Sequence, residues 1–131
     1  MRSFLDTNIL VYGLLSDDPR RDRAEKLLAA GGILSVQVLN EFASVAQKKL
    51  NRQWQEIQEA VALILTRAKR VRPLTVDTHI SALALARAHR LAFYDATIVA
   101  SAIEAKCEVL LTEDMQHGRR IGDLTIHNPF L

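Results

Sequence analysis

The sequence is poor in cysteine and aromatic residues and has no long hydrophobic run. Cys107 is the one cysteine among 131 residues, so it cannot form an internal disulfide, and we expect a reduced thiol packed in the core. No stretch of about 18 uncharged apolar residues occurs, and Asp6 interrupts the apolar run near the start, so the pattern indicates neither a membrane span nor a signal peptide. We therefore expect a soluble protein of the cytoplasm. With 5% aromatic residues, no platform for base stacking stands out.

Several common catalytic motifs are also missing. The chain has no Gly-x-Gly-x-x-Gly and no Gly-Lys-Ser/Thr loop, which argues against dinucleotide and P-loop sites. No Ser-His-Asp or Cys-His arrangement is visible. A phosphatase of the haloacid dehalogenase type needs a second Asp two residues after Asp6, where this chain has Asn8. A receiver domain needs an acid pair at the end of the first strand, which a lone Asp6 does not provide.

Hydrophobicity and charge are compatible with a globular domain and do not by themselves identify a partner. With 49% hydrophobic residues the chain can form a core, and its length fits one domain over residues 1–131. Seventeen basic against fifteen acidic residues give a net charge of only +2. The basic residues gather in short clusters, which are typical either of solvated helix ends or of a surface that contacts phosphates. These clusters lie at residues 20–23, 48–52, 67–72 and 119–120.

Apolar runs alternate with helical patterns along the chain. The runs near the start and at residues 109–112 predict buried strands, and shorter runs at 33–35 and 124–126 predict two more. Helices between parallel strands predict an α/β fold, specifically a three-layer α/β/α sandwich with a mainly parallel central sheet. We expect helices near residues 8–15, around Leu27 and Leu28, at 36–49, 54–66, 79–89 and 96–106, N-caps at Ser35 and Thr78, and an extended link at 72–74.

Four acidic residues stand where this fold would bring them together. Asp6 and Asp114 each follow an apolar strand, Asp95 begins a helix, and Glu41 extends from the middle of one. Because ligands of open α/β sheets bind outside the carboxyl ends of the strands, we expect the four carboxylates to converge at that edge. Crowded carboxylates favour protonation unless a cation neutralises them, and hard oxygen ligands select Mg²⁺ or Mn²⁺. The sequence therefore predicts a metal site.

Each acid taken alone also has a structural explanation. Asp6 and Asp95 are good helix N-cap residues, and Glu113 and Asp114 fit a solvated turn. Glu41 is harder to explain in this way, because it borders the apolar stripe of its helix. Taken together, repeated acids at the ends of buried strands favour a functional site, since burial of an unpaired carboxylate is costly.

The order of these motifs resembles the PIN-domain nucleases, and within them the VapC-type toxins of toxin–antitoxin pairs. The resemblance covers nearly the whole chain, and the tail from Asp114 to Phe130 resembles one branch of the family. It rests on four motifs in order: Leu5-Asp6-Thr7-Asn8-Ile9-Leu10, Ser35 to Asn40-Glu41-Phe42, Phe93-Tyr94-Asp95-Ala96 running into Val99-Ala100-Ser101-Ala102, and Leu111-Thr112-Glu113-Asp114.

The resemblance implies a site and a function. It implies a Mg²⁺-dependent ribonuclease, with Mn²⁺ as a substitute ion, that hydrolyses RNA phosphodiester bonds through a metal-activated water. It also implies an RNA substrate, a homodimer and a cognate VapB-type antitoxin. His117 is expected either to contact phosphate or to be a loop residue without a role. The implied catalytic and metal-binding residues are Asp6, Glu41, Asp95 and Asp114, with Asn8, Thr112 and Ser35 as supporting polar residues.

Two other functions are compatible with the same motifs. A PIN-like domain can bind RNA or a protein partner without cutting, and an active nuclease can process RNA in a housekeeping role. Loss of one of the four acids would favour binding alone. All four are present, so the sequence favours catalysis.

Overall fold

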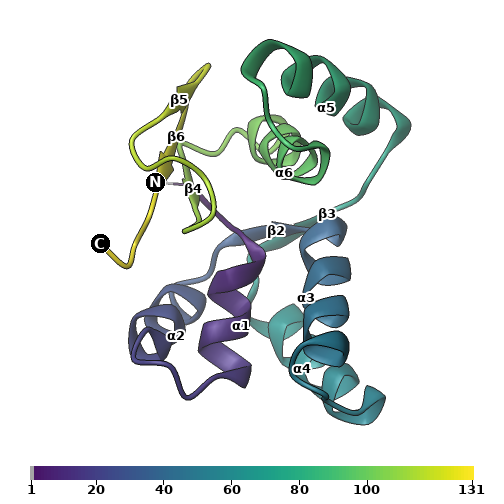
Figure 1. Cartoon of the computed structure of the whole chain (residues 1–131), viewed down its shortest axis with the longest axis vertical. Coiled ribbons are helices and arrows are strands. Elements are labelled where there is room, and N and C mark those ends of the chain that lie inside the picture. The colour runs from purple at the N-terminus through teal and green to yellow at the C-terminus, as the bar shows by residue number, and fades with distance from the viewer. Residues whose placement is uncertain (1) are drawn as a thin grey trace.

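A central six-stranded sheet with helices on both sides forms the structure, a computed structural model that describes residues 2–131 (Figure 1). The strand order is β3-β2-β1-β4-β6-β5, and all neighbouring strands are parallel except β5 and β6. The predicted α/β fold with a mainly parallel sheet is confirmed. The strands span Ser3–Leu5 (β1), Ile33–Ser35 (β2), Arg70–Arg72 (β3), Val109–Leu111 (β4), Arg120–Ile121 (β5) and Leu124–His127 (β6).

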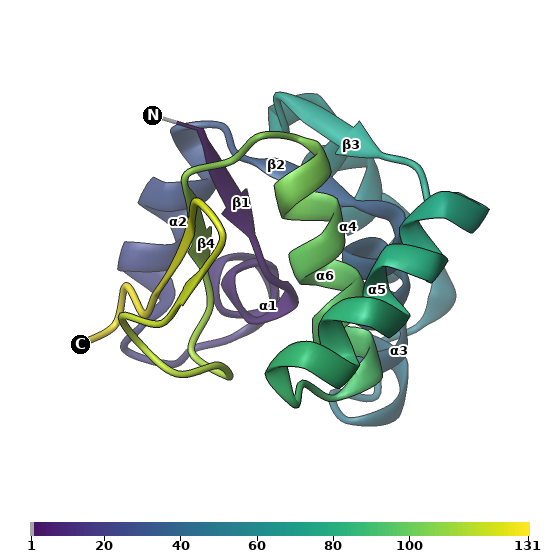
Figure 2. The same ribbon diagram turned by 90° about the horizontal axis from the view of Figure 1, so that it is seen from above.

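Six helices cover the sheet within residues 2–131. In Figure 1, α1 to α4 lie on one side of the strands and α5 and α6 on the other, and Figure 2 shows α6 between the sheet and α5. All of these helices, over the residues described, are too short or too polar to cross a membrane. They span Thr7–Leu15 (α1), Arg21–Ala29 (α2), Val36–Lys48 (α3), Trp54–Arg67 (α4), Val76–His89 (α5) and Phe93–Glu104 (α6).

The register of β1 and β4 sets the position of the site. Leu5 pairs with Leu111, so Asp6 and Thr112 follow the two strands at the same edge of the sheet. The Asp6 backbone N–H continues the pairing by donating to the Leu111 carbonyl at 3.0 Å. Gly32 lies so close to Leu5 that an added Cβ would meet Leu5 Cγ at 2.5 Å. A glycine before β2 therefore allows the chain to pack tightly beside β1.

The hydrophobic core fills both faces of the sheet. Phe4, Leu34 and Leu110 contribute fully buried side chains from three adjacent strands, and Phe42 contributes one from α3. Cys107 is 5% exposed and packs in this same core, as we expected from the sequence. The core therefore packs around β1 and β4, the strands that lead into the acidic motifs.

The first helical turns differ in detail from our expectations. We expected Thr78 to cap α5, but the helix begins at Val76 and its N-cap is Thr75, whose hydroxyl accepts from the Thr78 N–H. We expected Asp95 to be the N-terminal acid just before α6, but α6 begins at Phe93, which places Asp95 inside the first turn. A carboxylate in a first turn still benefits from the positive end of the helix dipole.

The sequence pattern did not predict two short strands, β3 and β5. The link expected at residues 72–74 overlaps β3, which ends at Arg72 and pairs in parallel with β2 at the edge of the sheet. The hairpin of β5 and β6 turns at Gly122, whose φ of 60° favours glycine. Edge strands carry charged residues readily, so Arg70 and Arg72 gave no apolar signal.

Candidate metal centre

Asp6 is the most buried of the four acids. It is the N-cap of α1, one residue past β1, and it is 3% exposed. Its Oδ1 accepts a hydrogen bond from the Thr7 backbone N–H at 2.7 Å, and its Oδ2 accepts one from the Thr112 hydroxyl at 2.7 Å. Burial raises the pKa of Asp6 to about 6, although the two hydrogen bonds act in the opposite direction. The ionised form of Asp6 is therefore disfavoured in the folded protein.

Glu41 reaches the same space from the middle of α3. It is half-buried, and its Oε2 accepts a hydrogen bond from the Thr7 hydroxyl at 3.3 Å. Burial raises the pKa of Glu41 to about 7, and the negative charge of Asp6 adds to this shift. The two carboxyl groups therefore repel each other's charge near neutral pH.

Asp95 and Asp114 complete the group from α6 and from the loop after β4. Burial and the charge of Asp114 raise the pKa of Asp95. Asp114 is exposed, and its Oδ2 accepts a hydrogen bond from Asn8 Nδ2 at 3.0 Å. Its backbone N–H donates to the Thr112 hydroxyl at 3.1 Å. Both residues line the same pocket as Asp6 and Glu41.

The structure brings all four predicted acids to one pocket of about 300 Å³. Lys49 is the one basic residue among the side chains that line it, so the pocket is strongly acidic. Across residues 2–131, however, no three Asp, Glu, His or Cys side chains converge tightly enough to enclose an ion. The carboxylates stand on the walls of the pocket instead of surrounding a single point. The pocket is lined by Asp6, Thr7, Asn8, Val11, Tyr12, Glu41, Val45, Lys49, Asp95 and Asp114.

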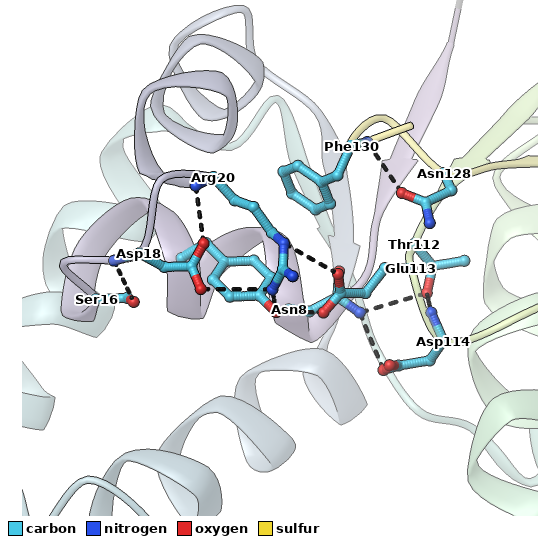
Figure 3. Close-up of polar contacts among 10 residues, drawn as sticks. Asn8, Ser16, Asp18, Arg20, Thr112, Glu113, Asp114, Asn128 and Phe130 are labelled. Atoms are coloured by element: carbon cyan, nitrogen blue, oxygen red, sulfur yellow. Dashed lines mark hydrogen bonds and ion pairs between the residues drawn. The ribbon is translucent and has the colours of Figure 1, made fainter.

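Asn8 and Thr112 connect the two acids at the strand ends, and Figure 3 shows their contacts with each other and with Asp114. The Thr112 side chain is fully buried, and its hydroxyl donates to Asp6 while it accepts from Asn8 Nδ2 at 3.4 Å and from the Asp114 N–H. Asn8 Oδ1 is buried without a hydrogen-bond partner. An unpartnered oxygen beside two carboxylates suits a cation or its bound water.

Ser35 and His117 have structural contacts in place of contacts with the acids. The Ser35 hydroxyl accepts from the Val38 N–H and caps α3, which accounts for its position. His117 Nδ1 accepts a hydrogen bond from the Asn128 backbone N–H at 2.9 Å, and its ring lies 4.9 Å from that of His127. The loop that carries Asp114 is thereby fastened to the C-terminal tail.

A second polar network borders the pocket, and the sequence did not point to it. The Tyr12 hydroxyl donates to Glu113, and the Arg20 guanidinium donates to the same hydroxyl. Arg20 Nε also lies 3.8 Å from Glu113 Oε2, and Figure 3 shows these groups next to the Asp114 loop. The ring of Phe130 packs edge-on against Tyr12 at 5.3 Å. Glu113 is therefore turned toward Arg20, away from the acidic pocket.

A sequence signal for part of this network exists in retrospect. Tyr12 lies four residues after Asn8 on α1, which places the two side chains on one face of the helix. Asn8 contacts Asp114, so a residue one turn further along that face can reach Glu113. The contacts of Arg20 and Phe130 depend on long-range packing that no local pattern shows.

The PIN domain family profile matches residues 3–122. No curated protein matches this chain. Similar solved structures include VapBC2 from Rickettsia felis bound to a promoter DNA fragment, with 21% identity, a TM-score of 0.72 and 98% of each chain covered. A toxin–antitoxin complex from Klebsiella pneumoniae has 23% identity, a TM-score of 0.72 and 97% of each chain covered.

A third similar structure is VapC20 of Mycobacterium tuberculosis, described as a toxin that cleaves the sarcin–ricin loop. It has 23% identity and a TM-score of 0.69, with 82% of this chain and 86% of that chain covered. At these identities the structural likeness shows the shared fold, and the profile match extends over most of the chain. The chain therefore belongs to the PIN domain family.

Proposed function

We propose that this protein is a Mg²⁺-dependent ribonuclease that hydrolyses RNA phosphodiester bonds. The main supporting observation is that four carboxylates from four separate elements line one pocket at the carboxyl edge of the sheet. The acidic pocket alone would repel RNA, so catalysis on a phosphodiester requires a cation between the two. The similar fold of VapC20, described as a toxin that cleaves the sarcin–ricin loop, adds support.

The residues of the pocket fit a hard divalent ion. Asp6, Glu41, Asp95 and Asp114 offer carboxylate oxygens, which suit Mg²⁺, with Mn²⁺ as a substitute. The buried, unpartnered Asn8 Oδ1 adds a further oxygen at the same place. A bound ion would lower the pKa of a water molecule and stabilise charge on the leaving oxygen. We assign ion binding to the four acids.

The chain's own side chains would orient these ligands and the substrate. Thr112 and Asn8 hold Asp6 and Asp114 by hydrogen bonds, which fixes the orientation of the two carboxylates. Lys49 is an exposed residue that lines the pocket, and we assign it a contact with a phosphate of the RNA. These roles need no nucleophilic side chain.

We further propose that the protein acts as the toxin of a VapBC-type pair, with a VapB-type antitoxin as its partner. Several solved structures of similar fold are VapBC or toxin–antitoxin complexes, which supports a protein partner of this kind. We also propose a homodimer. Val76, Ile80 and Leu83 form an apolar stripe on α5 and are 74%, 58% and 52% exposed, which is consistent with a surface that packs against a second copy.

Cleavage of total RNA by the purified protein tests the proposed activity. We expect degradation with Mg²⁺ or Mn²⁺ and none with EDTA. Asp6→Asn should lower the rate by at least about a hundredfold, because even groups that only support metal ligands are worth about 10- to 100-fold. Asp123→Asn, which changes an exposed acid outside the pocket, is the matched control and should cleave normally.

Growth provides a second measurement for the same variants. Expression of the wild-type chain without its partner should arrest growth, and expression of Asp6→Asn should not. Intact RNA in every condition, with wild type and Asp6→Asn alike, would refute the nuclease. RNA cleavage combined with normal growth would refute the toxin role and leave an RNA-processing nuclease.

A further inference from the structure

A smaller pocket of about 280 Å³ adjoins the acidic one. Glu41 lines both pockets, so the two cavities meet at this side chain. The remaining walls come from polar residues of α3 and from one exposed aromatic residue at the start of α6. The lining residues are Gln37, Asn40, Glu41, Ser44 and Tyr94.

The α3 wall presents a row of neutral polar groups beside Glu41. Gln37, Asn40 and Ser44 follow one another at intervals of three and four residues, so they share one face of the helix. Gln37 is 9% exposed, yet its amide takes part in none of the side-chain hydrogen bonds within residues 2–131. The amide oxygen and nitrogen of Gln37 are not themselves buried, so they are open to the space of the pocket and free to pair with a ligand there.

The opposite wall is the ring of Tyr94. This side chain is 60% exposed, although it directly precedes Asp95. Its backbone is fixed, because the Tyr94 carbonyl accepts a hydrogen bond from the Thr97 hydroxyl at 2.6 Å, and the Phe93 ring lies 5.7 Å away. An aromatic ring that is anchored at its base and open to solvent is a suitable stacking platform for a planar ligand.

The charge of the lining selects between ligand classes. No Lys or Arg lines this pocket, and Glu41 is its one charged residue, so a phosphate would be repelled. A neutral planar ring with donors and acceptors on its edge fits both walls, since every base has a π-face and an amide can pair with a base edge. The chemistry of the pocket therefore favours a nucleobase.

We propose that this pocket binds one nucleobase of single-stranded RNA, the base that flanks the phosphate at the acidic pocket. The base stacks on Tyr94, and the Gln37 amide reads its edge. Asn40 and Ser44 lie on the same wall and provide further hydrogen-bonding groups. This inference rests on the proposed function, because it takes RNA as the substrate, and it adds a site that selects where the RNA is cut.

Binding of short, fluorescently labelled single-stranded RNA tests the proposal. The measurement uses the Asp6→Asn background, so that the RNA stays intact, and replaces each nucleotide in turn by an abasic one. At one position the abasic RNA should bind about tenfold to a hundredfold more weakly, as expected for one stacked base. In the double variant Asp6→Asn, Tyr94→Ala the same abasic RNA should bind as well as the normal RNA does, because the ring that stacks on the base is already absent.

Three further variants make this test specific. Tyr94→Phe keeps the ring and should bind like tyrosine within about twofold, since stacking does not need the hydroxyl. Trp54→Ala removes another exposed aromatic, 63% exposed on α4, and should change nothing because it lies outside both pockets. Gln37→Met keeps a similar volume without donor or acceptor. In the otherwise wild-type protein it should broaden base preference among the cleavage sites.

The outcomes separate this inference from the proposed function. If RNA is cleaved but no abasic position depends on Tyr94, the base site is refuted and the nuclease stands. If one abasic position weakens binding only when Tyr94 is present, but the wild-type chain cuts no RNA, the nuclease is refuted and the base site stands. Equal loss of binding in Tyr94→Ala and Trp54→Ala, or no RNA binding at all, refutes the base site.

Discussion

The acids on the two sides of the pocket are held in different ways. Asp6 accepts two hydrogen bonds of 2.7 Å, and Asp114 is fixed through both its side chain and its backbone N–H. Glu41 has one longer hydrogen bond of 3.3 Å, and within residues 2–131 the Asp95 carboxylate accepts no hydrogen bond. One half of the pocket is therefore ordered, and the other half is held by few contacts.

This difference follows from the elements that carry the acids. Asp6 and Asp114 come after β1 and β4, which are adjacent parallel strands with a fixed register. Glu41 and Asp95 belong to α3 and α6, which lie at the same edge but share no hydrogen-bond ladder. Because no three acids converge in the structure, we expect the helix-borne pair to move toward the ion and the strand-borne pair to remain in place.

The largest expected difference between the halves concerns the two threonines that support them. Thr112→Val removes the hydroxyl shared by Asp6, Asn8 and Asp114, and we expect cleavage to fall by about 10- to 100-fold. Thr7→Val removes the single hydrogen bond to Glu41 but leaves the Thr7 backbone N–H in place, so we expect a loss of only a few-fold. Initial rates on one RNA substrate with saturating Mg²⁺ measure both.

Valine matches threonine in shape, so the two substitutions are directly comparable. Thr112→Val should also destabilise the fold by about 1–3 kcal/mol, because it leaves buried groups unpaired, and urea unfolding separates this effect from the rate. An equal loss of activity in the two variants would show that the two halves are ordered alike.

The second effect is the dependence of stability on pH without metal. The native pKa of Asp6 is about 6 against an ordinary 3.8, so the native state keeps this proton longer than the unfolded state does. The contribution of Asp6 to the free energy of unfolding therefore falls as pH rises from about 4 to 7, by about 2–3 kcal/mol in total. The pKa of Glu41, about 7, acts in the same direction.

Comparison with Asp6→Asn isolates this contribution. In EDTA the variant and the wild type should be similarly stable below about pH 4, and the variant should be the more stable of the two at pH 7. Urea unfolding at several pH values measures the difference. A difference that does not change with pH would show that Asp6 ionises normally, and the proposed crowding of charge would be wrong.

The smallest effect is stabilisation by Mg²⁺. An ion that binds the native state stabilises it by about 1.4 kcal/mol at ten times its Kd, which raises Tm by roughly 3 to 6 °C in a domain of this size. Asp95→Asn should reduce the rise in Tm and Asp6→Asn should abolish it, since Asp6 belongs to the ordered half. Asp123→Asn is again the control. A melting curve that Mg²⁺ leaves unchanged would contradict a metal site.

Sequence reasoning located the acids because their signal is local. Asp6 and Asp114 directly follow apolar runs, and parallel strands align their carboxyl ends, so their meeting could be predicted without coordinates. Glu41 stood out as an acid beside an apolar stripe. The pocket brings these residues together with Asp95, and their role as metal ligands is a prediction that the experiments above address.

The surroundings of the acids were harder to predict because they depend on distant parts of the chain. Arg20 and Phe130 both contact Tyr12, and nothing in their own segments indicates these contacts. Gln37 and Tyr94 face one pocket only because α3 and α6 meet at the sheet edge. In the sequence, Gln37 belongs to an ordinary helical pattern and Tyr94 is one of few aromatic residues. Neither residue therefore stood out as part of the base site that we propose.

The last residues have a practical consequence for fusion proteins. The family profile ends at residue 122, yet Phe130 packs against Tyr12 and Arg23 Nε donates to the Pro129 carbonyl at 3.3 Å. Tyr12 in turn holds Glu113, the neighbour of Asp114. An affinity tag joined directly to Leu131 would start one residue from this aromatic contact, so a weakly active fusion would first call for a longer linker or a tag at the other end.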